Sequence, residues 1–171
     1  MDITDEKTSS NELRIRRVEA AHICDLIRIA EETNLSPWTA QSYLDEIKNT
    51  SAIMLRLVKD DNSTIGFVVG RTVASGIVEA GQDAEIYNIA VTCAEQKKGC
   101  GQRLFEAFVS ECAQEGTANI WLEVRESNQK AMRFYERNGF TRVQTRSHFY
   151  NNPREHALLM RLNLSRIGGI T

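Results

Sequence analysis

The sequence predicts a single α/β domain, built on a central mixed β-sheet with helices on both faces. Three observations lead to this prediction. A strand-like run at 86–91, a helix-like run from Gly101 and a second strand at 119–124 form a βαβ unit, whose two strands lie parallel with a right-handed crossover. β-rich runs on either side of this unit are separated by short turns, which is typical of antiparallel pairing. Near the N-terminus, two further runs have apolar residues at helical spacing.

The first elements precede the centre of the predicted sheet. Residues 1–11 are polar and acidic, so we expect a flexible tail. Leu13 and Ile15 alternate with arginines, which predicts a short strand. Residues 20–32 place their apolar side chains on one helical face, which predicts an amphipathic helix.

A second helix and a hairpin follow. Ser36-Pro37-Trp38 predicts the start of the helix, with the serine as N-cap, the proline at the first helical position and the tryptophan pointing inward. The runs 51–59 and 64–73 predict two strands, because β-branched and apolar residues dominate them. Asp60-Asp61-Asn62-Ser63 between them is typical of a hairpin turn. Two glycines in the second strand indicate a β-bulge.

The C-terminal half completes the βαβ unit and adds a helix and two strands. The helix after the glycine-containing turn ends near Gly116. Ser127-Asn128 predicts the cap of a further helix, which stops at Gly139. The runs 142–149 and 156–164 predict the last two strands.

The composition is that of an ordinary globular protein and excludes several classes. The 171 residues are 42% hydrophobic and 26% charged with a net charge of −2, so we expect no direct nucleic-acid partner and no membrane. The N-terminus does not read as a signal peptide, and the four cysteines lack C-x-x-C spacing, which predicts reduced thiols and a cytoplasmic protein. The three histidines lack metal-ligand spacing. We expect residues 12–165 to form the domain, as a monomer or weak dimer, and residues 166–171 to form a tail.

The glycine-containing turn at 95–105 is the candidate anion site. Gly99 and Gly101 allow a tight turn that exposes successive backbone N–H groups at the start of a helix. Unpaired donors and the helix dipole favour an anion such as pyrophosphate there, and neighbouring lysines add positive charge. By itself the pattern also fits a plain strand-to-helix turn.

The turn and its surroundings resemble the GNAT (N-acetyltransferase) superfamily. Gln96-x-x-Gly99-x-Gly101 resembles the acetyl-CoA loop of that superfamily. A closer resemblance, to the bacterial ribosomal-protein-alanine N-acetyltransferases (RimI type), extends from about residue 13 to residue 162 and rests on further motifs. They are Ser36-Pro37-Trp38, Asn88-Ile89-Ala90-Val91, Trp121-Leu122-Glu123-Val124-Arg125, Ser127-Asn128, Ala131, Phe134-Tyr135-Glu136, Asn138-Gly139-Phe140 and Phe149-Tyr150-x-x-Pro153-x-Glu155-x-Ala157-x-x-Met160. The sequence departs from the usual pattern at Gln102, Phe149 and His156, and the two changes in the tail, Phe149 and His156, bear on the choice of substrate.

The resemblance implies a GNAT-like acyl-CoA N-acyltransferase fold, with acetyl-CoA as co-substrate and no metal. The backbone of Ile89-Ala90-Val91 would pair with the pantetheine arm like an added strand. Asn128 is either only a helix cap or a cap that also hydrogen-bonds the CoA arm. Trp38 and Tyr150 would flank an extended acceptor N-terminus. The residues implied for the pyrophosphate are Lys97, Lys98, Gly99, Cys100, Gly101 and Gln102.

Acetyl transfer to an amine needs a base for the amine and an acid for the departing thiolate. An α-amine has a pKa near ~8, so a modest base suffices, directly or through water. Glu123 is the candidate base, because it shares a strand face with Trp121 beyond the glycine turn; its alternative role is a solvated carboxylate on an edge strand. Glu85 on the neighbouring strand is the competing candidate.

Tyr135 is the candidate acid, and its alternative role is an aromatic core residue at helical spacing. Cys100 is a poor candidate for a covalent route, because no base lies near it at a suitable spacing.

Three classes of function remain open from the sequence. The first is an acetyltransferase that modifies the N-terminal α-amine of a protein, and the resemblance implies a ribosomal protein beginning with alanine. The second is a related acetyltransferase that acts on a small amine, an amino acid or an antibiotic. The third is a CoA-binding module without catalysis. A peptide acceptor needs an open groove and a small amine needs a closed pocket.

Overall fold

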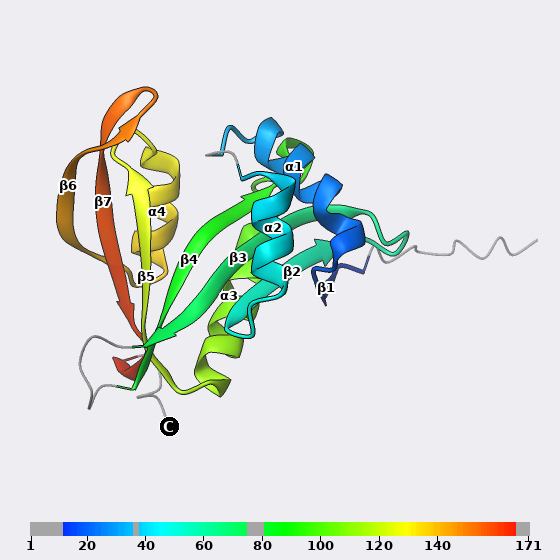
Figure 1. Cartoon of the computed structure of the whole chain (residues 1–171), viewed down its shortest axis with the longest axis horizontal. Coiled ribbons are helices and arrows are strands. Elements are labelled where there is room, and N and C mark those ends of the chain that lie inside the picture. Colours follow the sequence, from blue (N-terminus) through cyan, green and yellow to red (C-terminus); the bar gives the residue numbers. More distant parts are fainter. Residues whose placement is uncertain (1–11, 36–37, 75–80, 167–171) are drawn as a thin grey trace, which may run out of the picture.

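A seven-stranded mixed sheet forms the centre of the protein (Figure 1). The structure, a computed structural model, describes residues 12–35, 38–74 and 81–166. The strands are β1 (Arg14–Arg17), β2 (Ala52–Val58), β3 (Thr64–Ala74), β4 (Gln82–Val91), β5 (Thr117–Arg125), β6 (Thr141–Asn151) and β7 (Arg154–Asn163). Their order across the sheet is β1-β2-β3-β4-β5-β7-β6, and β4–β5 is the parallel pair among antiparallel neighbours.

Four helices cover the two faces of the sheet, which confirms the predicted fold class. They are α1 (Ile23–Glu32), α2 (Ala40–Ile47), α3 (Cys100–Gln114) and α4 (Gln129–Arg137), with short 3-10 turns η1 (Ala20–His22), η2 (Cys93–Glu95) and η3 (Leu164–Arg166). Leu26 of α1 and Tyr43 of α2 pack with Phe67 of β3 in one apolar cluster. Phe108 of α3 and Met132 of α4 belong to the cluster on the opposite face.

The two parallel strands separate halfway along their length. Their pairing begins at Gln82 with Thr117 and ends at Ile86 with Leu122, although both strands continue beyond that point. Figure 1 shows β4 and β5 diverging from the lower end of the sheet, with α4 and the β6–β7 hairpin carried away from α1 and α2. The backbone of β4 after Ile86 therefore faces β5 without being bonded to it.

A β-bulge accompanies this divergence. The register of β3 with β4 shifts between Val69 and Gly70, which leaves Tyr87 as the extra residue on β4. A Cβ atom at Gly70 would lie 2.2 Å from the Glu85 carbonyl oxygen and 2.7 Å from the Phe108 ring, so this strand position admits only glycine. The bulge predicted from the two glycines is thus present at Gly70.

The start of the second helix differs from the prediction. Ser36 and Pro37 lie outside the described residues, and Trp38 precedes the helix rather than opening it. Thr39 is the N-cap, because its hydroxyl accepts a hydrogen bond from the Ser42 N–H at 3.0 Å and so satisfies a free donor of the first turn. The predicted inward position of Trp38 is correct: its ring packs against Tyr43 at 5.3 Å between ring centroids.

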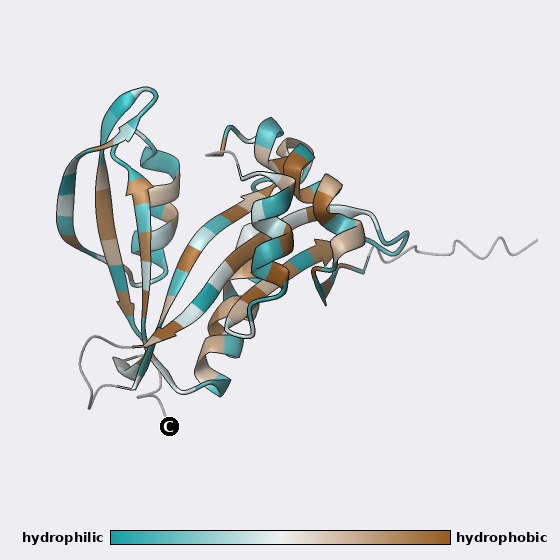
Figure 2. Cartoon of the chain, viewed as in Figure 1, coloured by the Kyte–Doolittle hydropathy of each residue, from teal (hydrophilic) through white to brown (hydrophobic). Residues whose placement is uncertain are grey.

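The two ends of the chain extend beyond the described residues. Residues 1–11 and 167–171 lie outside the described residues, and Arg166, predicted to begin the C-terminal tail, closes a 3-10 turn. The edge strand β6 is exposed along nearly its whole length and is more hydrophilic than its neighbour β7 (Figure 2). In the described parts of the chain, no helix combines the length and apolar character needed to cross a bilayer.

Candidate active site

A cleft of about 540 Å³ lies where β4 and β5 separate. Its walls come from the α1–α2 connection, the second half of β4, the end of β5, α4 and the β6–β7 hairpin. It brings together seven residues singled out from the sequence: Trp38, Glu85, Ile89, Glu123, Asn128, Tyr135 and Tyr150. Phe149 lines the cleft and is 42% exposed, so the cleft opens to solvent on the side of the hairpin.

Glu123 lies on the cleft side of β5, on the same strand face as Trp121, as predicted from the period-two pattern. Its carboxylate forms an ion pair with Arg146 of β6, and its side chain is 25% exposed. Glu123 therefore faces the cleft and has one cationic partner. Its side chain is partly exposed to solvent and is not enclosed by the indole ring of Trp121. Trp121 instead donates its indole N–H to Asp83 at 2.8 Å.

Glu85, the competing base, also lines the cleft, from the β4 side. It accepts a hydrogen bond from the Tyr87 hydroxyl at 2.9 Å. Burial, followed by this contact with Glu85, raises the pKa of Tyr87 above its ordinary value, so Tyr87 remains a proton donor in that bond. One lone pair of Glu85 is thus engaged within the protein.

Tyr135 is buried in α4, yet it lines the cleft. Its ring packs between Phe134 and Phe140 at 5.5 Å from each, which is the core role considered for it. Burial raises the pKa of its hydroxyl well above the ordinary value, so it stays protonated. Among the described residues, the hydroxyl has no hydrogen-bond partner. Tyr135 can therefore pack its ring in the core and still present its hydroxyl as a free donor to the cleft.

Asn128 caps α4, since its side-chain oxygen accepts the Ala131 N–H at 3.1 Å. The same residue lines the cleft, so both roles considered for it remain compatible with its place. Ile89 also lines the cleft, and Ala90 and Val91 continue β4 beyond it.

The glycine-containing turn lies beyond the end of β4 and opens α3. Gly99 is the N-cap in a left-handed conformation with φ 81°, and no side chain caps the helix. The first intrahelical hydrogen bond runs from Arg103 N–H to the Gly99 carbonyl at 3.1 Å. The N–H groups of the three residues before Arg103 are therefore free donors. A Cβ at Gly101 would meet only Val91, at an ordinary 3.9 Å, so packing within the protein does not require glycine there.

The side chains of the turn differ in their surroundings. Lys98 forms an ion pair with Glu95 at 3.1 Å, while Lys97 is exposed and has φ 63°. The Gln102 side chain donates to the Asn138 side-chain oxygen at 2.8 Å, and this hydrogen bond joins the start of α3 to the C-cap of α4. Cys100 is buried, and burial raises the pKa of its thiol, which is unfavourable for a nucleophile.

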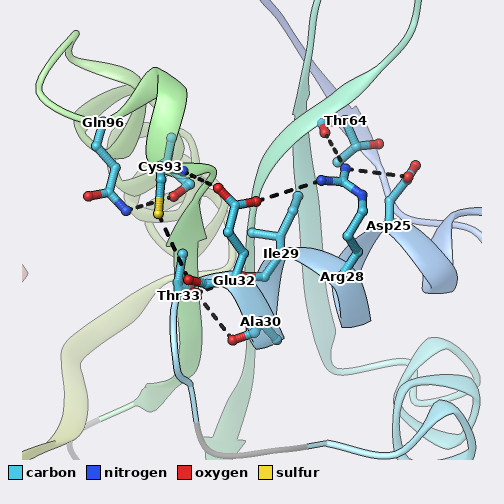
Figure 3. Close-up of polar contacts among 10 residues, drawn as sticks. Asp25, Arg28, Ile29, Ala30, Glu32, Thr33, Thr64, Cys93 and Gln96 are labelled. Atoms are coloured by element: carbon cyan, nitrogen blue, oxygen red, sulfur yellow. Dashed lines mark hydrogen bonds and ion pairs between the residues drawn. The ribbon is translucent and has the colours of Figure 1, made fainter.

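The end of α1 holds the segment between β4 and the glycine-containing turn in place (Figure 3). The Glu32 carboxylate accepts the Cys93 N–H at 2.6 Å, and its other oxygen lies 3.8 Å from Arg28. Gln96 donates to the Val91 carbonyl at 3.0 Å and accepts from Lys130 of α4. The turn is thus tied to α1 on one side and to α4 on the other.

The two arginines of the cleft, Arg125 and Arg146, received no role from the sequence. Arg146 lies on an exposed edge strand and reaches Glu123 through the antiparallel β5–β7–β6 arrangement, which no local pattern reveals. Arg125 closes the motif Trp121-Leu122-Glu123-Val124-Arg125, which assigns no role to it. Within the described residues, no group of three or more His, Cys, Asp or Glu side chains is placed to hold a metal ion.

Comparison with known proteins agrees with this geometry. Residues 23–140 match the Acetyltransferase (GNAT) family. The chain is 37% identical over 154 residues to ribosomal protein bS18-alanine N-acetyltransferase of Escherichia coli K12, covering 88% of this chain and 97% of the relative. The same enzyme of Haemophilus influenzae is 32% identical over 152 residues, covering 85% of this chain and 95% of the relative.

Solved structures support the fold. The crystal structure of the ribosomal-protein-S18-alanine N-acetyltransferase from Escherichia coli superposes with a TM-score of 0.77 at 26% identity, covering 94% of this chain and 99% of that one. Arabidopsis thaliana NAA60 in complex with acetyl-CoA gives a TM-score of 0.80 at 18% identity, covering 90% and 99% of the two chains. From the family match and these relatives, the chain belongs to the acetyltransferase (GNAT) family, whose acetyl donor is acetyl-CoA.

Proposed function

We propose that this enzyme transfers an acetyl group from acetyl-CoA to the N-terminal α-amine of a protein, and that the acceptor is a ribosomal protein beginning with alanine. One observation carries the proposal: Glu123 and Tyr135 line the same solvent-open cleft, at the point where β4 leaves β5. The names of the relatives support the acceptor, since they act on ribosomal protein bS18. Such an acceptor places the reaction in the cytoplasm.

The donor lies along β4 and the glycine-containing turn. Strand pairing with β5 stops at Ile86, so on that side the backbone of Ile89-Ala90-Val91 has no strand partner and pairs with the pantetheine amides, although the Val91 carbonyl also accepts from Gln96. The N–H groups from Lys98 to Gln102, which include the three free donors at the start of α3, bind the pyrophosphate, and Lys97 adds charge. Asn128 contacts the CoA arm from the cap of α4. The residues fit the donor, because the start of α3 has no side-chain cap and can bind the pyrophosphate, while the edge of β4 that faces away from β3 has no strand partner and can bind the pantetheine arm.

Glu123 serves as the base and Tyr135 as the acid. The Glu123 carboxylate accepts the amine proton, directly or through a water, as the nitrogen attacks the thioester carbonyl. Tyr135 then donates its hydroxyl proton as the CoA thiolate leaves. Its hydroxyl has no acceptor to release first among the residues that the structure describes, and its ring is held by the aromatic cluster around it. Glu85 remains the competing base on β4, with one carboxylate oxygen accepting from the Tyr87 hydroxyl.

The acceptor N-terminus enters between Trp38 of the α1–α2 connection and Tyr150 of the β6–β7 hairpin. Both are large aromatic side chains on opposite walls, which favours an extended chain with a small first residue. The opening beside Phe149 gives the rest of that chain a way out of the cleft.

A turnover assay with acetyl-CoA tests the proposal. The acceptors are a panel of peptides that differ in their first residue and a matched panel of small amines. We expect the highest kcat/KM for a peptide beginning with alanine. A preference for a small amine would replace the proposed acceptor, and CoA binding without turnover of any amine would identify a non-catalytic module.

A further inference from the structure

Arg125, the last residue of β5, contacts the tip of the β6–β7 hairpin at four points. Its guanidinium donates to the carbonyl oxygens of Asn152 at 3.2 Å and Pro153 at 3.4 Å. It also donates to the Glu155 carboxylate at 3.2 Å. Its central carbon lies 3.9 Å from the centroid of the Tyr150 ring, a close cation–π contact. One side chain thus binds both arms of the hairpin tip and supports the back of Tyr150.

Glu155 extends this contact to the start of α4. Its second carboxylate oxygen accepts the Ser127 N–H, next to the Asn128 cap. Hydrogen bonds from Ser127, with a further contribution from Arg125, lower the pKa of Glu155, so the pair is ionised at neutral pH. The side chains of Arg125 and Glu155 are 27% and 13% exposed, so solvent screens this pair less than an open surface pair.

The pairing of β7 with β5 ends at Ala157 opposite Arg125, so the tip of the hairpin lies beyond it. β6 is an exposed edge strand, and its register with β7 is broken between Arg146 and Tyr150. The residues in that break, 147–149, have no register partner on β7, although the His148 N–H donates to the His156 ring at 3.0 Å. Tyr150, however, lines the cleft near Glu123 and Tyr135. Its place there depends on how the tip is fixed.

We propose that Arg125 is a positioning residue that fixes Tyr150 on the acceptor side of the cleft by binding the hairpin tip to the end of β5. The proposal deepens the proposed function and rests on it for the identity of the acceptor. Arg125 acts through Tyr150 and not on the reacting atoms, so its loss affects acceptor binding more than the chemical step.

The variant Arg125→Lys isolates this role. Lysine keeps the charge but lacks the planar fork that reaches two carbonyls and a carboxylate while lying over a ring. We expect the KM for the acceptor to rise about tenfold, the effect of losing charge-assisted hydrogen bonds. The affinity for CoA and the kcat should stay within about twofold to threefold, as expected for a group that does not act in the transition state. Arg142→Lys is the matched control, since Arg142 is paired with Glu136 of α4 at the end of β6 far from the hairpin tip.

A double-mutant cycle tests whether Arg125 acts through Tyr150. Tyr150→Ala alone should raise the acceptor KM, and Arg125→Lys with Tyr150→Ala should be no worse than Tyr150→Ala alone. If the increases in acceptor KM of the two single variants multiplied in the double variant, the proposal would be overturned. An unchanged acceptor KM in Arg125→Lys would overturn it as well. So would a drop in kcat with no change in KM, which would place Arg125 in the chemical step.

A second measurement separates this proposal from the proposed function. Amide hydrogen exchange at residues 150–155, without any acceptor, should be faster in Arg125→Lys than in the wild type and in Arg142→Lys. If the wild type acetylates a small amine and no peptide, the proposed acceptor is wrong, and the same cycle is run with that amine. Equal exchange in all three proteins would overturn the role of Arg125 whatever the acceptor.

Discussion

The carboxylate of Glu123 on β5 forms an ion pair with the guanidinium of Arg146 on β6, across one wall of the cleft. Arg146 also lies over the Phe149 ring, 4.8 Å from its centroid, at the open side. The candidate base is therefore oriented by a half-exposed residue on an edge strand. An acceptor amine that approaches Glu123 enters beside this guanidinium, so the charge of Arg146 is part of the site.

Replacing Glu123 by glutamine should remove the base and leave the shape of the cleft. We expect kcat to fall by roughly 10²–10⁴, the usual contribution of a positioned acid or base. CoA affinity, measured by calorimetry, should not change, because Glu123 lies away from the glycine-containing turn. Glu85→Gln is the control, and we expect a smaller loss there. A larger loss in Glu85→Gln than in Glu123→Gln would assign the base to β4.

Gly101→Val should abolish CoA binding without unfolding the protein. A Cβ at Gly101 meets only Val91 at 3.9 Å within the protein, while its backbone is one of the free donors at the start of α3. A branched side chain there would keep the pyrophosphate from the N–H groups. Calorimetry should show lost CoA affinity, and the melting temperature should change little.

The contrasting variant is Gly70→Ala. Its Cβ would lie 2.2 Å from the Glu85 carbonyl oxygen, so overpacking should cost roughly 1–3 kcal/mol of unfolding free energy. Unchanged CoA affinity in folded Gly101→Val would contradict the binding role of the turn.

The enzyme should prefer an α-amine to a lysine side chain. An α-amine has a pKa near ~8 and lysine near ~10.4, so at neutral pH the unprotonated fraction differs by a few hundredfold. We expect kcat/KM to be at least ~10²-fold higher for an alanine-initiated peptide without lysine than for an N-terminally blocked peptide with one. Comparable values for the two peptides would point to a lysine acetyltransferase. Within the α-amine series, alanine and serine should exceed larger first residues.

The ion pair at the hairpin tip should make stability depend on pH in acid. The pKa of Glu155 is lowered in the folded protein by its hydrogen bonds from Ser127 and by Arg125, so the ionised form is favoured by folding. Its contribution is complete above the unfolded pKa of ~4.3 and is lost as the pH falls through the lower folded value.

The expected measurement is a comparison of melting temperatures with Glu155→Gln. The wild type should be more stable at pH 7, and the difference should shrink below pH ~4. A difference that stays constant as the pH falls well below ~4 would show that Glu155 contributes by packing and not by charge.

Local patterns were sufficient to predict most elements of the fold. Period-two alternation placed β5, and helical spacing with Asn128 as cap placed α4. The predicted start of α2 was wrong, because Thr39, three residues after Ser36, is also a residue type suited to the N-cap and takes that position. Propensity alone does not choose between neighbouring caps.

The site was predictable only in part, because its contacts are far apart in the sequence. Glu123 and Arg146 are on strands that are not direct neighbours, and their meeting depends on the register of β5 with β7 and of β7 with β6. The same holds for Arg125 and Tyr150. A sequence pattern sets which side of a strand a residue faces, but not which residue lies opposite it.

Tyr135→Phe should separate the catalytic role of this residue from its packing role. The ring, held between Phe134 and Phe140, is retained, and the hydroxyl has no hydrogen-bond partner among the described residues. Stability and CoA affinity should therefore stay close to those of the wild type. Turnover should fall by roughly 10²–10⁴, because the departing thiolate loses the donor that stabilises its charge and supplies its proton.

A residue that only fills the core gives the opposite result, a nearly unchanged kcat with a small shift in melting temperature. Phe134→Leu is the matched control, since it alters the same aromatic cluster from a side chain that does not line the cleft. It should lower the melting temperature more than the rate. If Tyr135→Phe turns over within a few-fold of the wild type, the thiolate leaves without help from Tyr135, and Tyr150 is the next hydroxyl in the cleft to test.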